Sequence, residues 1–178
     1  MNIFFLDHDA KKCAEYHVDR HCVKMILEYA QLLSTAHRVL DGKEVVCLSP
    51  SGRKQKQWKL PDQRDTLLYK ATHLNHPSAK WARHTRENYN WLYRLFRELC
   101  AEYTFRYGKV HLTDTKLGKL LKDPPKNIPR GEFCQPWRAM PDQFKVDGDA
   151  IQSYRNYYLG AKMNMFSWKK RPTPEWIV

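Results

Sequence analysis

The sequence predicts a mainly α-helical protein with a single domain over residues 1–178. Two long segments, 17–39 and 77–107, carry apolar residues at helical spacing. The segments between them are short and rich in proline, glycine and charged residues, which favours irregular connections. A chain of 178 residues, 42% of them apolar, can bury a core of ordinary size. We therefore expect two long helices that pack across each other.

The first elements are an extended N-terminal segment and the first long helix. Residues 2–6 are either a short strand or an extended lead-in, and the helical pattern begins near Ala10. Asp41 and Gly42 end the helix, since glycine just past the last apolar turn is a usual stop signal. Residues 45–48 are open to interpretation as a strand. Residues 49–61, "SPSGRKQKQWKLP", are expected to form a basic loop that either contacts phosphates or is merely solvated.

The second half begins with a helical stretch expected at 62–73. In "NHPSAKW", Pro77 fits the first helical position of the second long helix, and Gly108 fits its end. Residues 112–137 contain "KDPPKNIPRG" and are expected to be an ordered loop with little regular structure. A last helix is predicted at 147–165, within a basic and aromatic C-terminal segment that extends to residue 178.

The formal net charge of +12 is the strongest signal in the composition. It favours a polyanionic partner, which we expect to be nucleic acid and specifically double-stranded DNA. A basic surface without a specialised role is the alternative. No segment has the length of a membrane span or of a signal-peptide core, so we expect no membrane partner. The five scattered cysteines are typical of reduced thiols in a cytoplasm.

The first long helix carries one narrow line of polar side chains on an otherwise apolar circumference. A helix turns by about 100° per residue, which places these side chains within roughly 80° of one another. Two interpretations are open. The line either meets water at the domain edge, or it forms the floor of a cleft in which neighbouring groups tune one another's protonation. The line comprises His17, His21, Lys24, Glu28, Gln31 and Thr35.

Other chemical signatures are weak or missing in the sequence. Cys13, His17 and His21 recur every four residues, but a structural zinc site would need a fourth ligand and a helix break near Tyr16 would separate them. We found no glycine-rich phosphate loop, no GxSxG motif and no paired-aspartate motif. We therefore expect neither a metal ion nor a cofactor.

The chain resembles a widespread family of tailed-phage proteins at "HVDRHCVKMILEYAQLLSTAHR", "NHPSAKWARHTRENYNWL", "EYTFRYGKVH" and the C-terminal "YRNYYLG". This likeness covers nearly the whole chain but carries little functional information. Over about half of the chain, the sequence also resembles the phage pyrimidine-dimer DNA glycosylases with AP-lyase activity. These are small, basic, helical, single-domain proteins without a metal ion. The histidine and glutamate seven residues apart in their early helix match His21 and Glu28.

This resemblance implies a Schiff-base chemistry, but the chain differs from the glycosylases at two points. The glycosylases attack with the α-amine of a threonine exposed by removal of the initiator methionine, whereas Asn2 is the second residue here. The arginines of their early helix are replaced by Leu27 and Gln31. The nucleophile is therefore open between the chain's own α-amine and Lys24. α-Amino groups ordinarily titrate near pH 8 and lysines near pH 10.4, so Lys24 would need burial or cationic neighbours.

The predicted function is excision of damaged or modified pyrimidines from DNA by an N-glycosylase with Schiff-base AP-lyase activity, in the host-cell cytoplasm. Glu28 would stabilise the cationic sugar and move protons, and His21 would orient Glu28 or contact phosphate. His17, Gln31 and Thr35 would line the substrate. The residues expected to bind nucleic-acid phosphates are Arg20, Arg38, Arg83, Arg86, Lys169, Lys170 and Arg171.

Two other functions fit the same residues. One is a base-flipping enzyme that alters a modified phage pyrimidine without breaking the strand. The other is a nucleic-acid-binding protein without catalysis, for which the basic surface would suffice. An enzyme predicts that the polar line converges on a concave pocket, whereas a binding protein allows it to spread over a convex surface.

Overall fold

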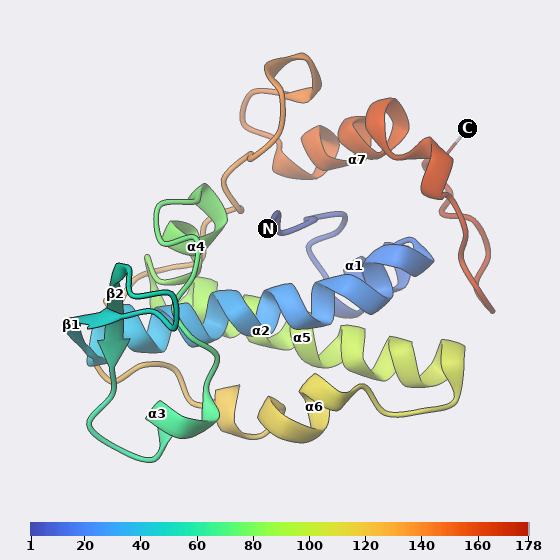
Figure 1. Cartoon of the computed structure of the whole chain (residues 1–178). Helices are drawn as coiled ribbons and strands as arrows, with labels where there is room; N and C mark the ends of the chain where they lie inside the picture. Colours follow the sequence, from blue (N-terminus) through green and yellow to red (C-terminus); the bar gives the residue numbers. More distant parts are fainter. Residues whose placement is uncertain (178) are drawn as a thin grey trace.

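A computed structural model of the chain describes residues 1–177 (Figure 1). As the sequence predicts, the protein is mainly α-helical, and the described residues contain one two-stranded sheet. The helices are α1 (Ala10–Tyr16), α2 (Asp19–Asp41), α3 (Arg64–Leu67), α4 (Pro77–Ala82), α5 (Arg86–Tyr107), α6 (Leu112–Leu117) and α7 (Ala150–Ala161). The 3-10 turns are η1 (Leu120–Lys122), η2 (Asp142–Phe144) and η3 (Met163–Met165), and the strands are β1 (Lys43–Leu48) and β2 (Lys54–Lys59).

The two long helices α2 and α5 pack against each other at the centre of the molecule (Figure 1). Their contact faces bury large apolar side chains such as Leu33, Leu92 and Phe96. Helix α1 packs on α5, α6 packs on α2, and α7 lies on the opposite side from α6. The N-terminal segment is an extended lead-in between α2 and α7, and residues 3–6 of this segment are buried.

The first helical region is divided into α1 and α2. His17 and Val18 have extended backbone conformations, which end α1 and let the chain turn before Asp19. Gly42 closes α2, as predicted from the sequence. Because of the break, Cys13 and His21 do not share one continuous helix with His17. Residues 1–177 contain no cluster of three or more side chains that could hold a metal ion.

The second helical region also has a break that the sequence analysis missed. Helix α4 begins at Pro77, as predicted, and has His76 as its N-cap, but it ends at Ala82. Thr85 then starts α5, and its hydroxyl accepts a hydrogen bond from the Asn88 backbone nitrogen at 3.2 Å. Gly108 ends α5 in the left-handed conformation with φ of 70°, as expected of a glycine stop.

Two predicted connections and two predicted helices are also wrong in part. Residues 54–59 form β2 instead of a loop, because they pair in antiparallel register with β1. The helix expected at 62–73 is only one turn, α3, after which the chain runs extended. The proline-rich segment 112–137 contains α6 and η1 before the chain becomes irregular. The last predicted helix is shorter than expected and ends at Ala161.

Candidate active site

A hollow of about 340 Å³ lies between the N-terminal segment, α2 and α7. Three members of the predicted polar line, His21, Lys24 and Glu28, face it from α2. The polar line therefore converges on a concave site over this part of its length. The full lining comprises Met1, Asn2, Phe4, His21, Lys24, Met25, Glu28, Ala139, Tyr157 and Lys162.

The Glu28 carboxylate lies between two amines in this hollow. Its Oε2 is 3.5 Å from the α-amino nitrogen of Met1, and its Oε1 is 3.2 Å from Lys24 Nζ. The Lys24 side chain is 69% exposed, whereas the Met1 side chain is only 5% exposed. Glu28 itself is 14% exposed, so its carboxylate is partly withdrawn from water. The site therefore pairs one partly shielded carboxylate with two amines, one on a residue whose side chain is buried and one at the end of an exposed lysine side chain.

The position of Met1 is fixed by hydrogen bonds a few residues further along the chain. The Phe4 backbone nitrogen donates to the Tyr29 hydroxyl at 3.2 Å. The Cys13 thiol donates to the Phe4 carbonyl oxygen, with Sγ 3.2 Å from that oxygen. These bonds attach the N-terminal segment to both α1 and α2, and so carry the α-amine to Glu28.

His17 supports this attachment and does not line the site. Its Nε2 lies 2.8 Å from the Tyr29 hydroxyl and its Nδ1 lies 2.7 Å from the Cys13 carbonyl oxygen. Burial lowers the pKa of His17 to about 4, so the ring is neutral near pH 7. The prediction that His17 lines the substrate is therefore wrong, because the break before α2 turns the ring into the core.

His21 is held on two sides at the edge of the hollow. Its ring stacks on Phe4 with centroids 4.2 Å apart and planes inclined by 17°. Its Nδ1 lies 2.7 Å from the hydroxyl of Tyr158 in α7, and Nε2 has no hydrogen-bond partner within residues 1–177. Burial lowers the pKa of His21 to about 3, and the charges of His17, Lys162 and Lys24 act in the same direction. The neutral ring is thus oriented with one nitrogen available to a ligand.

Several site residues escaped the sequence analysis. Lys162 contributes a third amine to the hollow, and its Nζ lies 4.9 Å from the centroid of the Tyr157 ring. Only the basic and aromatic composition around these two residues signalled a role. Phe4 had no signal beyond its place in a short apolar run.

The far end of the predicted polar line does not reach the hollow. Thr35 is fully buried, and its hydroxyl accepts a hydrogen bond from the Thr72 backbone nitrogen at 3.2 Å. The expectation that Thr35 lines the substrate is wrong, because the extended chain before α4 covers it. Gln31 is half-buried and is not part of the lining.

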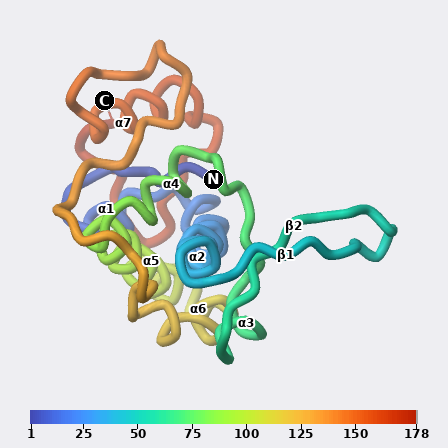
Figure 2. The backbone as a smooth tube through the Cα atoms, turned by 90° about the vertical axis from the view of Figure 1, so that its left-hand side faces the viewer, coloured from blue at the N-terminus to red at the C-terminus, as the bar shows by residue number. Residues whose placement is uncertain are grey.

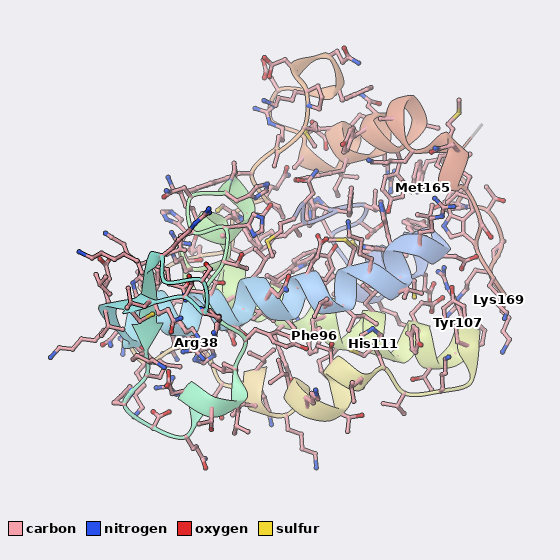
Figure 3. The ribbon with its side chains drawn as sticks, in the orientation of Figure 1. Arg38, Phe96, Tyr107, His111, Met165 and Lys169 are labelled. Atoms are coloured by element: carbon pink, nitrogen blue, oxygen red, sulfur yellow. The ribbon has the colours of Figure 1, made fainter. Side chains whose placement is uncertain are left out.

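Three of the predicted phosphate-binding arginines, Arg38, Arg83 and Arg171, are structural. Arg38 is buried, and its guanidinium donates to the carbonyl oxygens of Trp58, Asp65, Leu68 and Tyr69 and to the Asp65 carboxylate (Figure 3). Every donor direction of this side chain is therefore used inside the protein.

Arg83 is half-buried and donates to the carbonyl oxygens of Leu74 and Ala79 at 2.8 Å. It therefore completes the backbone hydrogen bonds around α4 and does not reach out to a ligand. Arg20 and Arg86 are exposed and form no ion pair within residues 1–177, so their assignment to phosphate binding stays a prediction.

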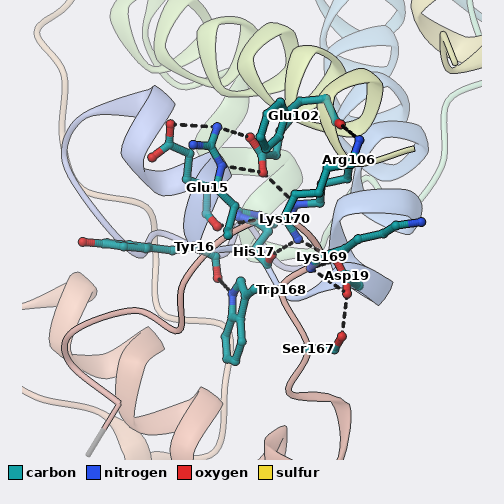
Figure 4. A network of polar contacts seen from close by, with 12 residues as sticks. Glu15, Tyr16, His17, Asp19, Glu102, Arg106, Ser167, Trp168, Lys169 and Lys170 are labelled. Carbon is teal, nitrogen blue, oxygen red and sulfur yellow. Dashed lines mark hydrogen bonds and ion pairs between the residues drawn. The ribbon is translucent and has the colours of Figure 1, made fainter. Parts of the chain in front are cut away.

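The basic C-terminal cluster, Lys169, Lys170 and Arg171, anchors the tail to the helical body (Figure 4). Arg171 pairs with Glu102 at 2.9 Å and with Glu15 at 3.2 Å. Lys170 Nζ donates to the Phe105 carbonyl oxygen at 2.9 Å. Arg171 is therefore a structural residue, and the prediction that it binds phosphate is wrong.

Lys169 remains exposed at the end of α5. Its Nζ lies 5.3 Å from the centroid of the Tyr107 ring (Figure 3). Its backbone nitrogen donates to the Asp19 carboxylate, which holds the tail but leaves the ammonium group open to water. Lys169 can therefore still reach a phosphate.

Comparisons of the chain with protein-family models, with curated proteins and with solved structures found no match. Within residues 1–177, no helix is both long enough and apolar enough to cross a membrane. The assignment of a function therefore depends on the geometry and charge of the hollow at Glu28.

Proposed function

We propose that the protein excises damaged or modified pyrimidines from duplex DNA as an N-glycosylase and then cleaves the abasic site as a lyase. The observation that carries this proposal is the Glu28 carboxylate, 3.5 Å from the α-amine of Met1 and 3.2 Å from Lys24 Nζ in one hollow. An amine beside a partly buried carboxylate is the pair that Schiff-base chemistry at a sugar requires.

The α-amine is the proposed nucleophile. It belongs to a residue that lines the hollow and whose side chain is buried, whereas the Lys24 side chain is largely exposed. α-Amino groups also titrate near pH 8 and lysine side chains near pH 10.4, so a larger fraction of an α-amine is ordinarily unprotonated at neutral pH. If the initiator methionine is removed, the α-amine of Asn2, which also lines the hollow, takes this role.

The reaction proceeds at the C1′ carbon of a nucleotide that has left the base stack. The amine nitrogen forms a bond to C1′, and the base leaves with the electron pair of its glycosidic bond. Glu28 accepts the proton that the amine loses and gives it to O4′ as the C1′–O4′ bond breaks, so that the ring opens and an iminium ion forms between the nitrogen and C1′. The ionised Glu28 then takes a C2′ proton, and the electron pair of that C–H bond expels the 3′ phosphate and breaks the strand.

The charges around the hollow suit this substrate. Met1, Lys24 and Lys162 present three amines against the single carboxylate of Glu28, which favours an anionic ligand such as a nucleic-acid phosphate. The neutral His21 offers a ring nitrogen at the edge of the hollow. It is placed to hydrogen-bond a phosphate or sugar oxygen without adding a charge.

Borohydride trapping tests the proposal, because it reduces the iminium ion to a stable covalent adduct. Duplex DNA with an abasic site, and duplex DNA with ultraviolet lesions, should each give an adduct with the full chain. Glu28→Gln should retain DNA binding and lower the rate of adduct formation by about 10²–10⁴-fold. Glu132→Gln, at an exposed position in a loop, is the matched control and should react like the unsubstituted protein.

The same experiment separates the other two functions. If no substrate gives an adduct and Glu28→Gln changes nothing, the proposal is wrong. A change in nucleoside mass without strand cleavage would instead indicate a base-modifying enzyme. Salt-dependent DNA retention without any chemistry would indicate a binding protein.

A further inference from the structure

The β1–β2 hairpin projects away from the helical body into solvent (Figure 2). Its register pairs Leu48 with Lys54 and Val46 with Lys56, next to the closing loop. The loop is ordered, since the Ser49 backbone nitrogen donates to the Arg53 carbonyl oxygen at 2.8 Å. The hairpin is thus a formed two-stranded ribbon whose faces are both without a covering element over much of their length.

One face of this ribbon combines aliphatic and cationic side chains. Residues directly opposite each other in an antiparallel pair share a face, and so do alternate residues of each strand. Val46 and Leu48 therefore lie on the same face as Lys54 and Lys56. Val46 is 64% exposed and Leu48 is 67% exposed, which is costly for aliphatic groups unless a partner covers them.

The charge of the hairpin is strongly positive. Residues 43–59 contain one acidic residue, Glu44, which pairs with Lys56 across the strands at 2.8 Å. Lys59 pairs with Asp65 at the base of the hairpin at 3.5 Å. Within residues 1–177, the remaining cations of the hairpin form no ion pair. They are Lys43, Arg53 and Lys54.

The base of the hairpin is held rigidly. The Arg38 guanidinium donates to the Trp58 carbonyl oxygen at 2.8 Å and to the Asp65 carboxylate at 2.7 Å. The Asp65 carboxylate also accepts a hydrogen bond from the Leu60 backbone nitrogen at 2.9 Å. Buried Arg38 therefore fixes the direction in which the ribbon leaves the end of α2.

From these observations we propose that the hairpin is a second DNA contact, which enters a groove of the duplex. Its free cations bind phosphates at the groove edges, while Val46 and Leu48 contact sugars and base edges within the groove. Two-stranded ribbons fit DNA grooves, and apolar side chains on such elements press between or against bases. The choice of duplex DNA as the polyanion rests on the proposed function.

The geometry allows one duplex to reach both sites. Glu28 lies in the middle of α2, and the hairpin begins just past its end at Gly42. Fourteen residues of helix span about 21 Å, which equals about six base pairs of DNA. A second copy of the chain is a poorer occupant, because lysines along both strands would repel an identical ribbon.

DNA binding by the full chain tests this contact. Anisotropy titrations would use an undamaged fluorescent duplex and carry Glu28→Gln in every protein to prevent turnover. Arg53→Gln with Lys54→Gln should weaken binding by about tenfold. The slope of the logarithm of the affinity against the logarithm of the salt concentration should decrease by the amount that about two phosphate contacts contribute. The matched control, Lys116→Gln with Lys119→Gln, removes the same charge in and just after α6 and should change the affinity by less than about twofold.

A second variant tests the apolar strip. Val46→Ala with Leu48→Ala should weaken duplex binding while leaving the salt dependence unchanged, because it removes no charge. If both hairpin variants bind like the α6 control, the proposed contact is wrong. It is equally wrong if they only dissociate a protein dimer, as seen by sedimentation.

The two proposals fail in different ways. If the hairpin variants bind duplex DNA as tightly as the control while borohydride trapping is intact, the hairpin contact alone is refuted. Hairpin-dependent binding without any trapped adduct would refute the glycosylase chemistry and leave the contact in place.

Discussion

The hydroxyl of Tyr29 lies 3.2 Å from the backbone nitrogen of Phe4 and so attaches the N-terminal segment to the middle of α2. The same hydroxyl lies 2.8 Å from Nε2 of His17. With Tyr29 donating to the neutral ring and accepting from Phe4, all three groups are satisfied. Because Met1 is only three residues before Phe4, this bond controls where the α-amine lies relative to Glu28.

Tyr29→Phe should therefore affect both stability and chemistry. It leaves the Phe4 N–H and His17 Nε2 without a partner, so we expect the free energy of unfolding to fall by about 1–3 kcal/mol. Adduct formation should slow as well, since the α-amine loses its fixed position. Tyr93→Phe is the control, because Tyr93 donates to the Gly118 carbonyl oxygen at 2.8 Å, away from the hollow. Urea unfolding and trapping rates should be measured for both variants. If Tyr29 has no positioning role, the two variants will lose the same amount of trapping activity.

The stability of the protein should depend on pH through its buried histidines. Burial is the main cause that lowers the pKa of His17 and His37 to about 4 and that of His21 to about 3. In the unfolded chain these rings titrate near pH 6.5. From about pH 6.5 down to about pH 4, the unfolded chain therefore binds protons that the folded chain does not. The free energy of unfolding should therefore decrease as the pH is lowered from about 6.5 to about 4, and it should change little above pH 6.5.

His37→Gln isolates one of these contributions away from the site. His37 lies 2.9 Å from the Tyr89 hydroxyl and 3.0 Å from an Arg64 guanidinium nitrogen. Its replacement should lower stability near pH 7 and reduce the slope against pH by at most about 1.4 kcal/mol per pH unit. Urea unfolding at several pH values measures this slope. A free energy of unfolding that is constant over the window would contradict the assignment of neutral buried histidines.

Arg106 should contribute far more to stability than an exposed arginine of the same helix. It is fully buried and pairs with Glu102 at 2.7 Å and Asp19 at 2.9 Å (Figure 4). Arg106→Gln removes a fully buried cationic partner from both carboxylates, and we expect a loss of about 3–5 kcal/mol. Arg97 forms an exposed pair with Asp114, so Arg97→Gln should cost at most about 1 kcal/mol. Similar urea midpoints for the two variants would contradict the view that the buried Arg106 contributes far more to stability than the exposed Arg97.

Lys24→Gln separates the two candidate amines. Because Lys24 Nζ is largely solvated, its removal should leave adduct formation within about tenfold of the unsubstituted protein. Any loss would reflect weaker attraction of phosphate, and it should diminish as substrate concentration rises. Complete loss of the adduct at saturating DNA would make Lys24 the nucleophile.

The helix ends were largely predictable, whereas the breaks and the second strand were not. Gly42, Pro77 and Gly108 are local signals that act whatever packs around them. Thr85 fits the apolar spacing of a continuous helix, and only its cap bond to Asn88 reveals the break. Strand β2, "KQKQWK", lacks an apolar alternation, and its structure comes from pairing with β1.

The candidate site was predictable along α2 and, through the resemblance to the glycosylases, at the α-amine. The turn of about 100° per residue placed His21, Lys24 and Glu28 on one side of the helix, and these three do share the hollow. The direction of a side chain around the helix does not tell which segments cover it. Thr35 was therefore assigned to the substrate site, whereas the segment that contains Thr72 covers it. Phe4 and Lys162 reach the hollow from distant parts of the sequence, which only the tertiary packing of the N-terminal segment and α7 brings together.

The most direct test is to locate the reduced adduct within the chain. Intact mass would first identify the amino-terminal residue, and peptide mapping after borohydride reduction would then find the residue that carries the sugar. We predict one modified nitrogen, the α-amine next to Glu28, with the Lys24 peptide unmodified. A modified Lys24 peptide, or no adduct on any lesion-bearing duplex, would contradict this prediction.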